Sequence, residues 1–301
     1  MKKPHVYRTL ANDLARQLKA SRSLPLGGFA PATKPKLSRT ASRAILFSPH
    51  PDDECIIGAL PLRLLREGGM RVINVAITLG SRKDRRSGRW KELQAACSFL
   101  GLETVRIISG GLDTISPKGR KENPANWTAA VDLVAKKIRA TRPTVLFFPH
   151  EDDWNQTHIG THLLVREALT RPDSIFDGWI VETEYWGAMK NPNLMVESTP
   201  DEVGDLAAAL SFHIGEVVRN PYHTTMPAWM TDNVRRGGEL VGGQGGTPPD
   251  FSYATLYRVT RWSKGRAESA WEGGRILSSQ DPLTPLFHLS ARVAKPKPPR
   301  R

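Results

Sequence analysis

The sequence has few cysteines and no long apolar run. Only Cys55 and Cys97 are present among 301 residues, which excludes a disulfide-rich scaffold and a four-cysteine zinc site. Both fall in predicted helices, where we interpret them as small buried apolar residues. No apolar stretch reaches the roughly 18 residues of a membrane span, and the basic N-terminus lacks the apolar segment of a signal peptide. We therefore expect a protein of the reducing cytoplasm.

Acidic residues are scarce at the two ends of the chain. The net charge is +13, with +9 in residues 1–43 and +5 in residues 292–301, so residues 44–291 carry −1. Basic, proline-rich ends of this kind are typically solvated and suit contact with anionic surfaces. A near-neutral core argues against a nucleic-acid-binding fold.

Between residues 44 and 170, apolar runs alternate with amphipathic segments, which predicts a mostly parallel, Rossmann-like β-sheet flanked by helices. Beyond residue 175 the pattern changes, and we expect a C-terminal antiparallel extension. Residues 237–246 are glycine-rich and form either a lid near the site or a plain connector. We divide the chain into a basic helix and linker arm, a catalytic domain and a C-terminal extension with a basic tail (1–42, 43–265 and 266–301). Expected strands cover 44–49, 71–78, 104–109, 144–149, 179–186 and 253–261, and expected helices cover 6–20, 56–68, 88–100, 125–141, 158–170 and 201–218.

The run Ser48-Pro49-His50-Pro51-Asp52-Asp53-Glu54 follows the first predicted strand. Ligands of open α/β sheets bind at the carboxyl ends of strands. His50 and Asp53 can ligate zinc there, which leaves Asp52 free to handle protons beside the metal. The alternative interpretation is an acidic turn that begins a helix.

The run that ends the 144–149 strand repeats this design, with acids and imidazoles in Pro149-His150-Glu151-Asp152-Asp153 and then His158. We choose His158 as the third metal ligand, with His150 and His162 as competitors. Asp152 or Asp153 is expected to orient a ligand histidine.

The motif His50-Pro51-Asp52-Asp53-Glu54 resembles the signature of the PIG-L/LmbE superfamily of zinc-dependent de-N-acetylases, over about residues 43–260. The resemblance implies the LmbE-like fold, zinc ligation by His50 and Asp53, and a general base at Asp52. The family's second motif, His-Pro-Asp-His, ends in the third ligand and matches Asn155-Gln156-Thr157-His158.

Two positions depart from that second motif. Asn155 stands where the family has a histidine that helps stabilise the oxyanion, and Thr157 replaces an aspartate. An asparagine amide can donate to an oxyanion but cannot carry a proton. The resemblance further implies substrate contacts by Arg89, in Arg89-Trp90-Lys91-Glu92-Leu93, and by Asp113. The alternative for Arg89 is an ion pair with Glu92, and the alternative for Asp113 is a structural role in a turn. We assign no role to Asn220-Pro221-Tyr222-His223.

The resulting hypothesis is a Zn²⁺ hydrolase, with Fe²⁺ as the alternative metal, that removes an acetyl group from an N-acetylated amino sugar or its conjugate. Its rivals are a metal-dependent amidase or esterase with a non-sugar substrate, and a catalytically weakened family member that acts as a binding protein. The sequence leaves homo-oligomer formation open.

Overall fold

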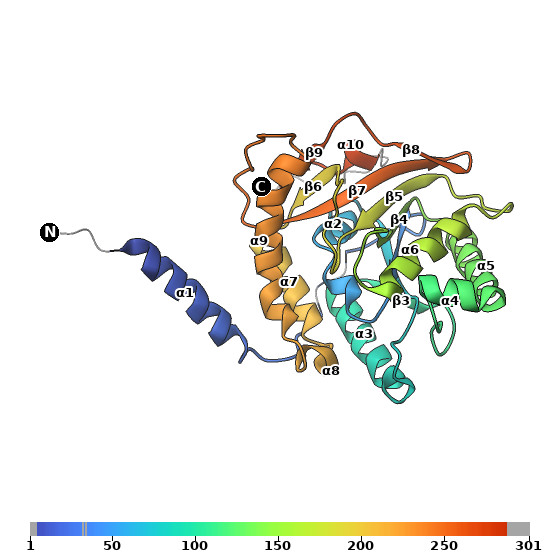
Figure 1. Ribbon diagram of the computed structural model, residues 1–301, viewed down its shortest axis with the longest axis horizontal. Coiled ribbons are helices and arrows are strands. Elements are labelled where there is room, and N and C mark those ends of the chain that lie inside the picture. The colour runs from blue at the N-terminus through green and yellow to red at the C-terminus, as the bar shows by residue number, and fades with distance from the viewer. Residues whose placement is uncertain (1–4, 32, 34, 288–301) are drawn as a thin grey trace, which may run out of the picture.

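The computed structural model describes residues 5–31, 33 and 35–287, and within them nine strands form one sheet (Figure 1). The strand order is β3-β2-β1-β4-β5-β7-β6-β9, and β8 pairs with β7. The five neighbouring strands β3, β2, β1, β4 and β5 run parallel, whereas β7 is antiparallel to β5, β6 and β8. The expected α/β fold with a mostly parallel sheet and a C-terminal antiparallel part is confirmed. The strands are β1 Arg43–Ser48, β2 Arg71–Ala76, β3 Glu103–Arg106, β4 Val145–Pro149, β5 Gly178–Thr183, β6 Leu194–Glu197, β7 Ala254–Ser263, β8 Arg266–Ser269 and β9 Arg275–Leu277.

Helices cover both faces of the sheet because the central strands are apolar on both sides. Ala44 and Leu46 of β1 face one core and Ile45 the other, as the two-residue period of a strand requires. The first core contains α2 (Leu60–Arg66), α3 (Arg86–Leu100), α7 (Pro200–Leu210) and part of α9 (Tyr222–Leu240), and the second contains α5 (Pro124–Thr141) and α6 (Gln156–Leu169). The shorter helices are η1 Asp53–Cys55, η2 Lys83–Arg85, α4 Pro117–Glu122, α8 Ile214–Val217 and α10 Thr284–Phe287.

The connection from β1 runs through α2 to β2, whereas β4 lies on the other side of β1 and is followed by α6. The strand order therefore reverses between β1 and β4. Such a reversal opens a crevice at the carboxyl ends of the two strands, which is where open α/β sheets bind ligands.

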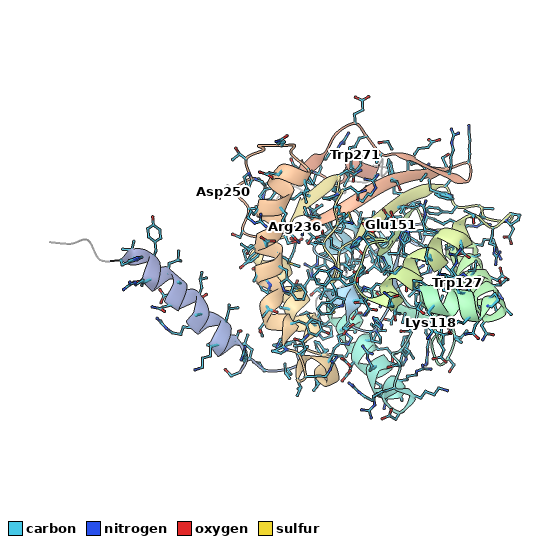
Figure 2. The ribbon with its side chains drawn as sticks, viewed as in Figure 1. Lys118, Trp127, Glu151, Arg236, Asp250 and Trp271 are labelled. Atoms are coloured by element: carbon cyan, nitrogen blue, oxygen red, sulfur yellow. The ribbon has the colours of Figure 1, made fainter. Side chains whose placement is uncertain are left out.

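Helix α1 (Val6–Ser21) projects from the body of the molecule and contacts it at α9 (Figures 1 and 2). None of its residues is buried, and Leu10, Leu14 and Leu18 remain exposed. None of the helices in the described part of the chain combines the length and apolar character that crossing a bilayer requires. The basic tail at 292–301 lies outside the described residues.

Three predicted segments differ from the structure. The helix expected over 201–218 is divided into α7 and α8. The helix expected over 56–68 begins only at Leu60, because Gly58 adopts a left-handed conformation (φ +78°) and a Cβ there would collide with Thr255. The glycine-rich segment is not all loop, since Gly237 and Gly238 belong to α9. Their missing side chains let α9 approach Met195 and Pro248, and no residue of 237–246 lines the cavity described below.

Candidate metal centre

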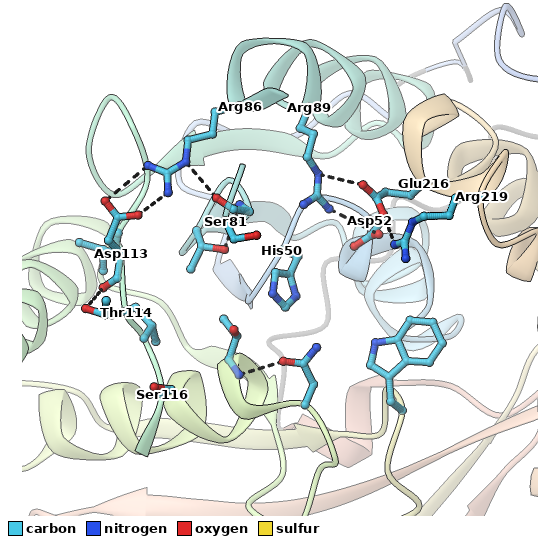
Figure 3. Close-up of a pocket in the computed structure, with 17 residues that line it drawn as sticks. His50, Asp52, Ser81, Arg86, Arg89, Asp113, Thr114, Ser116, Glu216 and Arg219 are labelled. Atoms are coloured by element: carbon cyan, nitrogen blue, oxygen red, sulfur yellow. Dashed lines mark hydrogen bonds and ion pairs between the residues drawn. The ribbon is translucent and has the colours of Figure 1, made fainter. Parts of the chain in front are cut away.

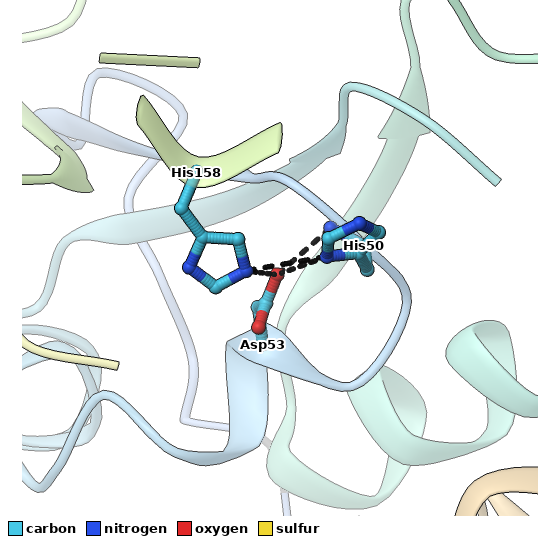
Figure 4. Close-up of side chains that lie close together, drawn as sticks. All are labelled: His50, Asp53 and His158. Carbon is cyan, nitrogen blue, oxygen red and sulfur yellow. Dashed lines mark hydrogen bonds and ion pairs between the residues drawn. The ribbon is translucent and has the colours of Figure 1, made fainter. Parts of the chain in front are cut away.

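Three side chains that the sequence singles out converge at the reversal between β1 and β4 (Figure 4). His50 and Asp53 follow β1, and His158 lies in the first turns of α6 after β4. His50 Nδ1 lies 3.2 Å from His158 Nε2. Asp53 Oδ2 lies 3.4 Å from His50 Nδ1 and 3.3 Å from His158 Nε2. His50, Asp53 and His158 therefore form a triangle of donor atoms, the metal trio.

The triangle has the size of a metal site. Zinc bonds to histidine nitrogen and carboxylate oxygen are about 2.0–2.2 Å long, so the ligand atoms on one edge of a tetrahedron lie about 3.3 Å apart. The three observed separations span 3.2–3.4 Å. The donor set and its spacing thus fit a divalent cation.

The charges of the trio also favour a cation. Burial disfavours the ionised Asp53 carboxylate, but the charge and hydrogen bond of His158, together with His50, hold the pKa of Asp53 well below its usual value. Burial opposes protonation of His158, yet Asp53 and Asp153 outweigh it and raise the pKa of His158 to about 10. Metal binding must therefore displace a proton from His158.

Asp153, rather than Asp152, lies behind His158. Its Oδ2 is 3.5 Å from His158 Nδ1, an atom with no hydrogen bond in the described structure. Its two oxygens also accept from the backbone N–H groups of Asn155, Trp186 and Gly187, which fixes the carboxylate. Asp152 instead pairs with Lys190 at the surface. Asp153 is therefore placed to orient the His158 ring. Thr157, which stands where the family has an aspartate, has no carboxylate for this role.

Asp52 lies beside the trio in a strained backbone conformation, with φ at +118°. Its carboxylate accepts a 2.5 Å hydrogen bond from the Tyr222 hydroxyl, and Arg89 lies 3.7 Å away. Burial and the neighbouring Asp53 raise the pKa of Asp52 to about 6, against the opposing charges of Arg89, His213 and His50. Asp52 is thus ionised at neutral pH and can accept a proton.

A buried ion pair holds the strained turn. The backbone N–H of Asp52 donates to Glu54 Oε2 at 3.0 Å, and Glu54 Oε1 pairs with His213 Nε2 at 2.7 Å. Cys55 donates to the same Glu54 oxygen. Both Glu54 oxygens therefore already have partners, and Glu54 connects the Asp52 turn to the chain before α8.

His50 of the metal trio lines a cavity of about 660 Å³, the catalytic cavity (Figure 3). His50 and Asp52 line it together with Asn155 and Trp186, and the rest of the wall is mainly polar. Hydroxyl and charged side chains of this kind suit a hydroxyl-rich ligand. They are Thr78, Ser81, Thr114, Ser116, Thr157, Arg86, Arg89, Asp113, Glu216 and Arg219.

Asn155 serves as the N-cap of α6. Its Oδ1 accepts from the backbone N–H of Thr157 at 2.8 Å, as a capping residue does. This hydrogen bond uses the amide oxygen, so the NH₂ group remains for a ligand in the cavity.

The two residues predicted to contact substrate both line the cavity. Arg89 donates to the carbonyl of Pro51 at 2.8 Å, and the ion pairs found for it in the described chain are to Asp52 and Glu216, not to Glu92. Asp113 pairs with Arg86, which lowers the pKa of Asp113 despite some burial.

The competing histidines lie outside the trio. His150 Nε2 is 2.9 Å from the carbonyl of Gly187, and His162 Nδ1 is 3.0 Å from that of Pro149. Burial lowers the pKa of His162. Both rings are therefore positioned by backbone carbonyls.

Sequence reasoning missed four residues of the site: Tyr222 on Asp52, Arg86 on Asp113, and Glu216 and Arg219 on the cavity wall. Of these four, only Tyr222 lies in a run named above, Asn220-Pro221-Tyr222-His223. Arg86 carries no local signal because its partner Asp113 lies 27 residues away, and Glu216 and Arg219 reach the cavity through the packing of a distant segment.

The chain is similar to known proteins in sequence and in fold. Residues 45–169 match the family described as PIG-L: GlcNAc-PI de-N-acetylase. The chain is 29% identical over 198 residues to the 1D-myo-inositol 2-acetamido-2-deoxy-alpha-D-glucopyranoside deacetylase of Streptomyces scabiei, covering 54% of this chain and 60% of that relative. It is 29% identical over 195 residues to the enzyme of the same name from Thermomonospora curvata, covering 56% and 63%. The chain thus spans about six-tenths of the length of these relatives.

Solved structures share the fold at low identity. An N,N'-diacetylchitobiose deacetylase from Pyrococcus horikoshii superposes with a TM-score of 0.52 at 17% identity, over 83% of this chain and 92% of that one. GalB, a 4-carboxy-2-hydroxymuconate hydratase from Pseudomonas putida KT2440, gives 0.54 at 15% identity, over 72% and 95%. Because these two proteins are named for different activities, the fold by itself does not decide the reaction.

Proposed function

Since residues 45–169 of this chain form a PIG-L family domain, we propose that the protein is a metal-dependent hydrolase that removes the acetyl group from an N-acetylated amino sugar or its conjugate. The observation that carries the proposal is the metal trio beside an unligated, buried carboxylate, Asp52, at the wall of a polar cavity. The named relatives, which are deacetylases of an acetamido sugar linked to inositol, support the substrate class.

The metal would be held by His50, Asp53 and His158. We propose Zn²⁺, because two imidazoles and one carboxylate are a usual set for hydrolytic zinc, and Fe²⁺ is the alternative that the same donors accept. A divalent ion bound there polarises a carbonyl and acidifies water.

The chain's own residues would carry the proton transfers. Asp52, ionised at neutral pH, takes a proton from the attacking water. The Asn155 NH₂ group donates to the oxygen that becomes negative as the acetamide carbonyl turns tetrahedral. Asp52 then returns its proton to the departing amine, so that the products are acetate and a free amino sugar. Tyr222 keeps the Asp52 carboxylate in position, and Arg89 and Asp113 contact the sugar.

The test is acetate release by the metal-loaded protein from a panel of N-acetyl amino sugars and glycoconjugates, with Asp52→Asn as the matched variant. We expect turnover by the wild type, and a loss of about 10²–10⁴-fold in the variant with metal content unchanged. Binding of metal without acetate release from any member of the panel would overturn the proposal.

A second reaction is compared directly, because GalB has the same fold and is named as a hydratase. With simple amides and esters added to the panel, a metal-dependent amidase or esterase with a non-sugar substrate would hydrolyse them at rates above those of the sugars. A binding protein with weakened catalysis would hydrolyse none of them.

Other expectations remain proposals. The free, buried thiols of Cys55 and Cys97 suit a cytoplasmic location. A homo-oligomer, contact of the basic ends with anionic surfaces and the division of the chain at residues 42 and 265 remain predictions.

A further inference from the structure

Next to the catalytic cavity lies a second cavity of about 370 Å³ with arginine-rich walls, the basic cavity. It is lined by Arg82, Arg85, Arg89, Arg219 and Glu216 together with the Leu79-Gly80-Ser81 turn after β2. Arg89, Glu216 and Arg219 also line the catalytic cavity, so the two spaces share a wall. A ligand in one could extend into the other.

Positive charge is concentrated at this point of the chain. Residues 82–89 contain five basic residues and one acid, whereas residues 44–291 as a whole carry −1. Arg86 and Arg89 fall in the first turn of α3, which contains no acidic residue. A helix N-terminus disfavours cations, because the backbone dipole is positive there. An anion bound near this turn would offset the unfavourable position of the two arginines.

The cavity's own acid does not neutralise its arginines. Glu216 lies 2.6 Å from Arg219, 3.0 Å from Arg85 and 3.8 Å from Arg89 (Figure 3 shows the pairing with Arg89 and Arg219). Arg89 also pairs with Asp52, and Arg82 pairs with Asp84. Three carboxylates therefore face the four arginines of the cavity, Arg82, Arg85, Arg89 and Arg219. The remaining positive charge is available to a second anion.

We propose that the basic cavity binds an oxyanion carried by the substrate, so that the amino sugar or the group linked to it bears a phosphate or a carboxylate. Guanidinium groups present paired, planar donors that match these anions. The acetamide would lie at the metal trio and the anion on the Arg85 side. This inference rests on the proposed function.

The test compares kcat/KM of the zinc-loaded full chain for N-acetylglucosamine, N-acetylglucosamine 1-phosphate and N-acetylmuramic acid. We expect an anionic substrate to exceed the neutral one by about tenfold or more, through KM, because each charge-assisted hydrogen bond contributes on the order of a tenfold change. The preference should shrink as salt increases. Preference for the 1-phosphate indicates a phosphate, and preference for the muramic acid indicates a carboxylate.

The double variant Arg82→Gln/Arg85→Gln should reduce the preference about tenfold. Arg266→Gln is the matched control, because Arg266 pairs with Glu268 two residues away just as Arg82 pairs with Asp84, and the two side chains are 75% and 69% exposed. The control should leave the preference unchanged. Equal kcat/KM for neutral and anionic sugars, or a preference that the double variant retains, would overturn the inference.

Calorimetric titration of the full chain with inorganic phosphate separates this inference from the proposed function. If no sugar releases acetate but phosphate binds and the double variant loses that binding, the deacetylase proposal fails and the anion site stands. Phosphate binding that is the same in wild type and double variant refutes the site.

Discussion

Asn155 has two roles, in helix capping and in catalysis, that substitutions can separate. Its Oδ1 caps α6 through the Thr157 N–H, and Asn155 lines a cavity together with His50 and Asp52, so that its NH₂ group can serve a ligand there. Asn155→Ser keeps an oxygen that can cap the helix but removes the NH₂ donor. Asn155→Ala removes both. If the amide stabilises the developing oxyanion, the two variants lose similar amounts of turnover but differ in stability.

The magnitudes follow from each hydrogen bond. Loss of one oxyanion donor lowers kcat by about 10²–10³-fold, or about 2.7–4 kcal/mol of transition-state stabilisation. Loss of an N-cap costs about 1 kcal/mol, which lowers Tm by about 2 °C in a domain of this size. We therefore expect kcat to fall by two to three orders of magnitude in both variants, and Tm to fall only in Asn155→Ala.

The assay is acetate release at saturating substrate, with thermal unfolding of the same metal-loaded samples. Asn155→His completes the series, because an imidazole can both donate and carry a proton, and it should raise kcat above wild type. An Asn155→Ser protein with kcat within about threefold of wild type would refute the oxyanion role. Equal Tm losses in the serine and alanine variants would refute the separation of the two roles.

Three further predictions concern the acid, the metal and the tyrosine. The kcat/KM of the wild type should decline as pH falls through about 6, because the pKa of Asp52 is raised to about 6 and only the ionised carboxylate accepts a proton. A bound cation would lower this pKa and move the decline to lower pH. A midpoint above pH 7 would contradict the assignment of Asp52 as the base. Metal affinity, measured by competition with a chromophoric chelator, should rise about tenfold per pH unit across the neutral range, because binding displaces the His158 proton. His158→Ala should abolish metal binding. An affinity that does not change with pH would be inconsistent with displacement of that proton. Tyr222→Phe should shift the acidic limb of kcat/KM to higher pH, because the lost O–H donor had stabilised the charged Asp52, and an unmoved limb would argue against the contact.

Local sequence patterns were sufficient to predict the strands and the helix that flank the metal trio. The apolar runs before His50 and before His150 became β1 and β4, and His158 lies in α6 as expected. These predictions succeeded because strand and helix periods, capping residues and metal-ligand chemistry are properties of short segments. The predicted start of α2 was wrong because Gly58 takes a left-handed conformation, at a position where Thr255 and Tyr257 leave no room for a Cβ.

Contacts from the distant C-terminal half could not be predicted. Tyr222 reaches Asp52 from 170 residues away, and His213 reaches Glu54 from 159 residues away. Neither partner has a recognisable spacing, because their positions depend on how α7 to α9 pack onto the first core. The Arg85–Glu216 and Arg89–Glu216 contacts arise from the same packing.

The sequence by itself determined which residues could bind a metal, that they follow apolar strands, and that Asp52 adjoins a ligand. Tertiary structure decided that β1 and β4 are neighbours, which brings His158 to within 3.2–3.3 Å of His50 and Asp53. It also decided which groups surround Asp52 and where the arginines gather. The reason is that bonding preferences act over a few residues, whereas strand order and helix packing depend on the free energy of the whole chain.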